Sequence, residues 1–243
     1  PEMADPKYYE SQPEFLKNTM NRTRWFWRFD TPEKYQKMVK GYYRMISGVD
    51  LVLGRILAEL RRSGLDKNTV VIFSSDNGYF LGERGYADKW LMYDLSIRVP
   101  LIFYDPRAPR GSRGLVRKEL VLNIDIPATI LDLAGLPLPD KYQGRSLKPL
   151  LGQAKIDWRK EIFCEELWDN PEIPQSECVR TDRWKYIQYP RHPEYVELFD
   201  LKTDPQEKHN LARLPQYQST LRELRDHCQK WVQRLVEDRK KFQ

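Results

Sequence analysis

The chain has 243 residues, enough for one large domain or two modest ones with a buried core. Only 40% of its residues are hydrophobic and 31% are charged, but 12% are aromatic, which excludes a disordered chain. The net charge is +6, and basic residues are interspersed with acidic ones, so we expect a mixed solvated surface and no nucleic-acid partner. No apolar stretch is long enough for a membrane span. The three cysteines form no CxxC pair, which predicts neither a zinc knuckle nor a redox pair.

The first 30 residues are rich in aromatic side chains and predict a long ordered loop with short helical pieces. We interpret Trp25 and Trp27 as packing residues rather than as platforms for sugar rings. Asn21 begins an Asn-x-Thr pattern for N-glycosylation, a short pattern that we interpret as accidental.

A long helix is predicted next, over residues 31–64. Thr31 can cap its first turn, Pro32 suits the first helical position, and a glycine closes it. Between these ends the apolar residues step by three and four, which predicts one buried face. Asp50 lies beside that face, and we favour a hydrogen-bonded structural carboxylate over a catalytic one.

The strands that follow are continuous apolar runs. Residues 70–75 do not alternate between polar and apolar side chains, which is typical of a parallel strand covered on both faces. Residues 99–104 have the same character, and residues 119–122 are predicted as another strand. Residues 126–134 predict a short helix capped by Asp125. Together these elements predict an α/β fold with a mostly parallel sheet flanked by helices.

The sequence changes character towards its end, and we place a domain boundary between residues 1–152 and residues 153–243. The second part is predicted as a smaller α+β subdomain, a four-stranded antiparallel sheet with a terminal helix. The four strands and the helix are predicted over residues 161–166, 177–181, 184–189, 195–199 and 215–240.

The loop after residues 70–75 carries the most informative chemistry. The strand stops at Asp76 and Asn77, a carboxylate beside an amide, and Lys89 lies in the glycine-containing segment that follows. Open α/β sheets bind ligands at the carboxyl ends of their strands, and hard cations prefer oxygen ligands. A nearby lysine adds a positive charge for an anion. A plain turn and a solvated lysine explain the same residues, so their chemistry leaves both interpretations open.

Ser-Asp-Asn-Gly at residues 75–78 and the segments around it resemble the type I sulfatases of the alkaline-phosphatase-like superfamily. The resemblance is collinear over residues 40–212. It is carried by the segments YRMISGVDLVLGRIL, LDKNTVVIFSSDNGYFLGERGYADKWLMYDLSIRVPLI, NIDIPATILDLAGLPLP and ELFDLKTDPQEKHNLA. It implies an alkaline-phosphatase-like fold and a sulfuric ester hydrolase that needs Ca²⁺. By this resemblance, Asp76 and Asn77 bind the cation, and Lys89 is the catalytic residue that contacts the substrate's sulfate group.

Two features depart from the family pattern. Arg84 stands where members often have histidine. The family's nucleophile is a formylglycine made from Cys or Ser in a Cys/Ser-x-Pro-x-Arg motif, and no such motif occurs in this chain. The resemblance therefore implies a fragment. Formylglycine is expected in a missing N-terminal half, which becomes this chain's partner, and the chain alone is expected to be inactive.

The resemblance also implies a sulfated carbohydrate or similar sulfate ester as substrate, and a periplasmic, extracellular or lysosomal location. Two alternatives stay open. The first is a phosphatase or phosphodiesterase of the same superfamily, because sulfate and phosphate esters share shape and charge. The second is a non-catalytic domain that binds sulfated polysaccharide, for which Arg180, Arg183 and Lys185 on a late hairpin are candidates.

Overall fold

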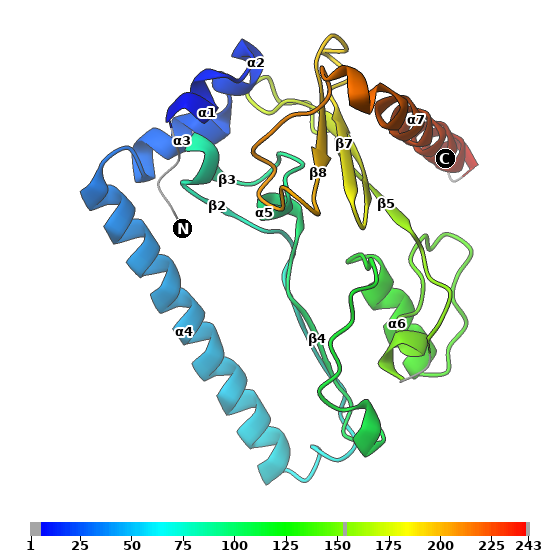
Figure 1. Ribbon diagram of the computed structural model, residues 1–243. Helices are drawn as coiled ribbons and strands as arrows, with labels where there is room; N and C mark the ends of the chain where they lie inside the picture. Colours follow the sequence, from blue (N-terminus) through cyan, green and yellow to red (C-terminus); the bar gives the residue numbers. More distant parts are fainter. Residues whose placement is uncertain (1–5, 153–154, 242–243) are drawn as a thin grey trace. The chain divides into compact units, whose positions relative to one another are not determined.

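The computed structural model describes residues 6–152 and 155–241 (Figure 1). The chain divides into two compact units. The first takes in Pro1–Pro109 and Asp169–Pro174, and the second takes in Arg110–Trp168 and Gln175–Gln243. The predicted domain boundary after residue 152 stays a prediction.

The first unit begins with three short helices, in agreement with the helical pieces expected there. They are α1 (Pro6–Glu10), α2 (Glu14–Lys17) and α3 (Met20–Arg28). Trp25 packs at the edge of a small core, whereas Trp27 is 63% exposed, so core packing is confirmed for Trp25 alone and packing of Trp27 at an interface stays a prediction. Asn21 is fully buried, which agrees with an accidental glycosylation pattern.

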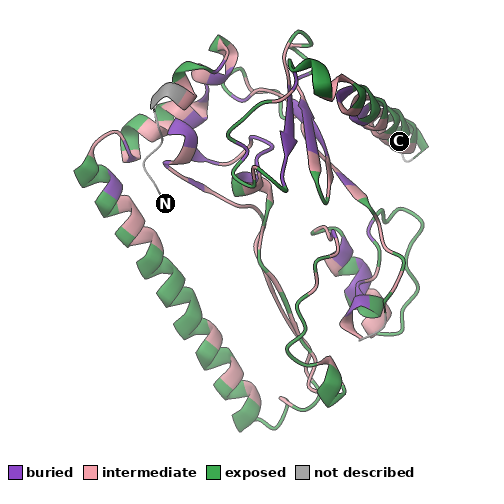
Figure 2. Cartoon of the chain, in the orientation of Figure 1, coloured by how far each residue is buried: buried purple, intermediate pink, exposed green. Residues whose placement is uncertain are grey.

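The long helix α4 (Pro32–Arg62) begins as predicted, because the backbone N–H of Lys34 donates to Oγ1 of Thr31. Its predicted apolar face is not buried: of its described side chains only Tyr35 is buried, and Asp50 is exposed (Figure 2). The spacing of apolar residues identifies a helix face that can pack against another surface, but it does not say whether that surface lies in the same chain. The exposed large apolar side chains are Tyr43, Met45, Ile46, Val49, Leu51, Val52 and Ile56. Among the described helices, none has the length and apolar content that crossing a membrane requires.

Two pairs of strands complete the first unit, with short helical turns between them. β1 (Val71–Ser74) and β4 (Leu101–Tyr104) pair antiparallel, so the parallel arrangement predicted for these two runs is wrong. A continuous apolar run does not determine strand direction. The cover predicted on both faces is also absent from β4, where Ile102 and Tyr104 are exposed. Between them lie an antiparallel pair and two helical turns, namely β2 (Phe80–Leu81), η1 (Glu83–Gly85), β3 (Ala87–Asp88) and α5 (Asp94–Ile97).

In the second unit, α6 (Asp125–Leu133) is fixed by a buried carboxylate. Asp125 was predicted to cap this helix, but it is the first helical residue. Its carboxylate accepts the backbone N–H of Leu122 at 2.7 Å and pairs with the guanidinium of Arg159. The structure has no strand at residues 119–122, so that prediction is wrong; the last residue of the run is instead held by this hydrogen bond to the carboxylate.

The predicted four-stranded antiparallel sheet is confirmed, in the order β5-β6-β7-β8. α7 packs on it through Leu221, Leu224 and Cys228. Burial raises the pKa of the Cys228 thiol to about 12, so this cysteine behaves as a small hydrophobic residue. The elements of this unit are η2 (Arg110–Ser112), η3 (Lys148–Leu151), β5 (Glu161–Glu166), β6 (Ser176–Thr181), β7 (Trp184–Gln188), β8 (Val196–Asp200), η4 (Pro215–Tyr217) and α7 (Gln218–Lys241).

Candidate functional site

The loop between β1 and β2 carries the two predicted metal ligands, Asp76 and Asn77. It is pinned at Gly78, whose backbone N–H donates to the carbonyl oxygen of Ser96 at 2.7 Å. A Cβ atom at Gly78 would collide with the carbonyl group of Leu95, so no larger residue fits. This close approach of two backbone segments fixes the direction in which the preceding carboxylate and amide leave the strand.

Asp76 is exposed, and its carboxylate favours the ionised form. Its Oδ1 accepts the backbone N–H of Asn77 at 2.9 Å. This bond, with a smaller contribution from the charge of Lys89, holds the pKa of Asp76 below its ordinary value of 3.8. The carboxylate is therefore negatively charged at neutral pH and open to solvent, so it is available to a hard cation.

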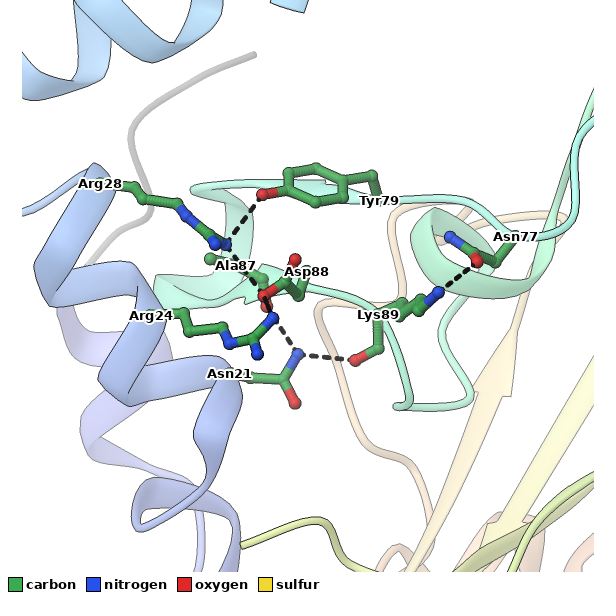
Figure 3. A network of polar contacts seen from close by, with 8 residues as sticks. All are labelled: Asn21, Arg24, Arg28, Asn77, Tyr79, Ala87, Asp88 and Lys89. Atoms are coloured by element: carbon green, nitrogen blue, oxygen red, sulfur yellow. Dashed lines mark hydrogen bonds and ion pairs between the residues drawn. The ribbon is translucent and has the colours of Figure 1, made fainter. Parts of the chain in front are cut away.

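Lys89 lies beside Asn77. Its Nζ donates to Oδ1 of Asn77 at 2.7 Å (Figure 3). The amide nitrogen of Asn77 donates to the carbonyl oxygen of Gly78 at 2.7 Å, and so leaves the amide oxygen to face the lysine. The structure thus brings together an ammonium group and the oxygen ligands that the sequence singled out, although their roles stay predictions.

A second group of charged residues adjoins Lys89, and the sequence did not single it out. Asp88 is buried, and its Oδ2 pairs with Arg24 at 2.5 Å and with Arg28 at 2.9 Å, both on α3. Arg28 also donates to the hydroxyl of Tyr79 at 3.0 Å. The sequence could indicate only that Arg24 and Arg28, which are four residues apart, lie on the same face of a helix. Nothing in the sequence indicated that this face meets a carboxylate 60 or more residues later.

Arg84, at the position where the resemblance leads one to expect histidine, is buried in an aromatic environment. Its guanidinium lies 3.8 Å from the ring centroid of Tyr93 and 4.1 Å from that of Tyr8. Its backbone is left-handed, with φ of 61°. This arrangement gives Arg84 a packing function within the turn that leads to Lys89.

Asp76 and Asn77 fit part of a calcium site. An ionised carboxylate and an amide carbonyl are hard oxygen donors, but Ca²⁺ takes about six to eight of them. Within residues 6–152 and 155–241, no three His, Cys, Asp or Glu side chains gather in a way that could hold a metal ion. The two residues are therefore compatible with the ion only as a part of a larger donor set.

Two family models match the chain. One, described as Sulfatase, matches residues 2–136, and the other, described as N-sulphoglucosamine sulphohydrolase, C-terminal, matches residues 82–234. N-acetylglucosamine-6-O-sulfatase of Bacteroides thetaiotaomicron is 34% identical over 196 residues, which cover 79% of this chain and 35% of the relative. Arylsulfatase K of Homo sapiens is 33% identical over 218 residues, which cover 87% of this chain and 38% of the relative. The chain thus spans little more than a third of the length of these curated relatives.

Solved structures share the fold. A protein in complex with its substrate D-glucosamine-2-N,6-O-disulfate has a TM-score of 0.77 and 31% identity, covering 84% of this chain and 42% of that one. A phosphonate monoester hydrolase from Silicibacter pomeroyi has a TM-score of 0.82 and 26% identity, covering 96% of this chain and 50% of that one. These likenesses confirm the predicted α/β fold of the alkaline-phosphatase-like kind, with its smaller C-terminal antiparallel sheet and helix.

Proposed function

Because the chain belongs to the sulfatase family, we propose that it is the part of a sulfuric ester hydrolase that holds two ligands of the metal site and the sulfate-binding lysine. The observation that carries the proposal is the 2.7 Å contact between Nζ of Lys89 and Oδ1 of Asn77, with Asp76 adjacent. An anion that displaces this contact meets a fixed ammonium group on one side and a cation held by oxygen ligands on the other.

Each residue has a defined task in this proposal. Asp76 and Asn77 would hold Ca²⁺ through their oxygen atoms, and the ion would supply positive charge for the ester oxygens and for an ionised nucleophile. Lys89 exchanges its amide partner for a sulfate oxygen and stabilises the negative charge that develops there in the transition state. The formylglycine nucleophile belongs to a part of the protein outside this chain, since no Cys/Ser-x-Pro-x-Arg motif occurs here.

We propose a sulfated carbohydrate as the substrate. The support is that one relative is named for a sulfated amino sugar, and that a structural neighbour was solved with a disulfated glucosamine as its substrate. A sulfated glucosamine is therefore the first compound to test.

A hydrolase of phosphate or phosphonate esters is the second candidate. It is favoured by the likeness to the phosphonate monoester hydrolase, at a TM-score of 0.82 and 26% identity. The polysaccharide-binding alternative has less support, because two of its three basic residues are engaged elsewhere. Lys185 is fully buried against Glu207, and Arg183 pairs with Asp200.

The proposal is tested on the full-length protein with matched sulfate and phosphate esters. We expect hydrolysis of the sulfate ester that is lost on chelation and restored by Ca²⁺. In the variant Asp76→Ala/Asn77→Ala, activity falls at least about 100-fold, and Ca²⁺ no longer raises the melting temperature.

The matched control is Asp66→Ala/Asn68→Ala, which removes a carboxylate and an amide at the other end of β1. It should retain both the activity and the stabilisation by Ca²⁺. An unchanged response to Ca²⁺ in the Asp76/Asn77 variant contradicts the metal site. A clear preference for the phosphate ester establishes the second candidate instead.

A further inference from the structure

Asn21 connects α3 to the backbone on both sides of Asp88. Its side-chain Nδ2 donates to the carbonyl oxygen of Ala87 at 2.7 Å and to that of Lys89 at 2.7 Å (Figure 3). The residue is fully buried, and its Oδ1 has no hydrogen-bond partner among the described residues. The two donor hydrogens are therefore what this side chain contributes, and both go to the segment that carries the lysine.

The segment around Lys89 has a backbone that needs such support. Asp88 and Trp90, the residues on either side of the lysine, have φ of 69° and 78°. Residues other than glycine rarely adopt this left-handed backbone conformation, and they keep it only where the surrounding structure imposes it. β3 supplies little support, because it pairs through only two residues, Ala87 and Asp88.

The ion pairs of α3 act on the side chain of Asp88, whereas Asn21 acts on the main chain of Lys89 itself. Arg24 and Arg28 neutralise and orient the Asp88 carboxylate. They do not hold the carbonyl group of Lys89, which is bonded to the Cα atom that carries the side chain. Asn21 makes that connection, so the position of the ammonium group relative to Asn77 depends on the amide of Asn21.

We propose that Asn21 is a positioning residue that acts through Lys89, by holding the left-handed turn from which the lysine reaches Asn77. This inference rests on the proposed function, in which Lys89 binds the sulfate group. A misplacement of a reacting or binding group by about 1 Å can cost about 100-fold in rate. We call the two hydrogen bonds from Asn21 to the carbonyl groups of Ala87 and Lys89 the clamp. Loss of the clamp should therefore lower the rate of catalysis.

The test is a double-mutant cycle in the full-length protein, with kcat/KM for a sulfate ester as the readout. Asn21→Asp keeps the shape of the side chain but removes both donors and places oxygen atoms against two carbonyl groups. We expect Asn21→Asp to lower kcat/KM by about 10- to 100-fold and Lys89→Ala to lower it by about 100-fold or more. In the Lys89→Ala background, Asn21→Asp should add less than about 3-fold, because the residue through which it acts is gone.

A purely structural role gives a different result. In that case the fold losses in kcat/KM of Asn21→Asp and Lys89→Ala would multiply in the double variant, which means that their free-energy changes add. This outcome overturns the proposal. Should Asn21→Asp fail to fold, Asn21→Gln replaces it in the cycle, since the longer side chain keeps both donors and shifts their position. The Gln variant is then expected to lose less activity than Lys89→Ala and to show the same lack of additivity.

Thr23→Ala is the matched control. Thr23 is exposed on the same helix, and its loss destroys the Asn-x-Thr pattern without touching the amide of Asn21. Activity equal to wild type is expected. A loss equal to that of Asn21→Asp would show that the effect does not come from the hydrogen bonds of Asn21, and it would overturn the proposal.

Hydrogen exchange separates this inference from the proposed function. Asn21→Asp should accelerate exchange in residues 86–92 while leaving the sheet of the second unit protected. If the wild-type protein hydrolyses no sulfate ester, the proposed function fails, and the exchange result alone decides on the clamp. Unchanged exchange in residues 86–92 then overturns it.

Discussion

Three residues that follow β1 in the chain show how a short stretch of sequence can bring an ammonium group to an amide oxygen next to a carboxylate. Asp76 and Asn77 lie on the loop after the strand, and Lys89 reaches Asn77 within 2.7 Å. The sequence could predict this group because an apolar strand, a polar loop and a lysine follow one another in the chain. It could not predict Asn21, which contacts the carbonyl groups of this segment across 66 and 68 residues. Hydrogen bonds to main-chain carbonyls leave no residue pattern at the accepting positions.

Glu83, in the turn before Lys89, predicts a dependence of stability on pH. Burial raises the pKa of this carboxyl above its ordinary value of 4.5, although its Oε2 accepts the backbone N–H of Leu81 at 2.5 Å. The folded state therefore holds the proton more tightly than the unfolded state. The stability gained from this proton is complete below the unfolded pKa and is lost as pH rises through the folded pKa.

The substitution Glu83→Gln keeps an oxygen acceptor and cannot ionise. Its melting temperature should rise relative to wild type between about pH 4 and about pH 8, since only wild type must ionise a buried group. Thermal unfolding of both proteins across this range measures the difference. The control is Glu59→Gln on α4, where the carboxylate is exposed. Its melting temperature should not rise relative to wild type as the pH increases. A difference independent of pH for Glu83→Gln would contradict the prediction.

At the scale of elements, the sequence predicted the second unit better than the first. Alternation and turn residues located all four strands, from β5 (Glu161–Glu166) to β8 (Val196–Asp200), because this sheet buries its apolar face against α7 within the same unit. α4 and β1 were found as elements, but the burial of α4 and the strand direction of β1 were predicted incorrectly. Those properties depend on what an apolar surface packs against, and a local pattern does not contain that information.

The sheet of the second unit encloses an ion pair that gives a prediction at this scale. Nζ of Lys185 on β7 lies 2.5 Å from Oε1 of Glu207, and the two side chains are 0% and 2% exposed. Removing one partner leaves a buried charge without its counter-charge, which costs about 3 to 5 kcal/mol. We therefore expect Glu207→Gln to lower the free energy of unfolding by about this amount, as measured by urea denaturation of the full-length protein.

The double variant Lys185→Met/Glu207→Gln tests the cause. It leaves no buried charge, so it should be more stable than Glu207→Gln alone. A double variant that is less stable than the single one would show that the pair matters through packing rather than through charge.

For the whole molecule, the exposed apolar surface and the length of the relatives point to one conclusion. α4 exposes Ile46, Val49 and Ile56, and β4 exposes Ile102 at 58%. Surfaces of this kind normally lie at an interface. The chain spans 35% and 38% of two relatives that carry the family's name. We therefore expect the part of the protein that supplies the nucleophile also to cover these faces.

The isolated chain of residues 1–243 should accordingly associate with itself and hydrolyse no sulfate ester. Association follows from the uncovered apolar side chains, and inactivity follows from the absence of a residue that could become formylglycine in the family motif. Sedimentation velocity measures the first, and turnover of a chromogenic sulfate ester measures the second. The variant Ile46→Glu/Val49→Lys should reduce association without creating activity. Because these outcomes have separate causes, a monomeric but inactive chain refutes only the uncovered interface, whereas sustained turnover by the isolated chain refutes the assignment of the nucleophile to another part of the protein.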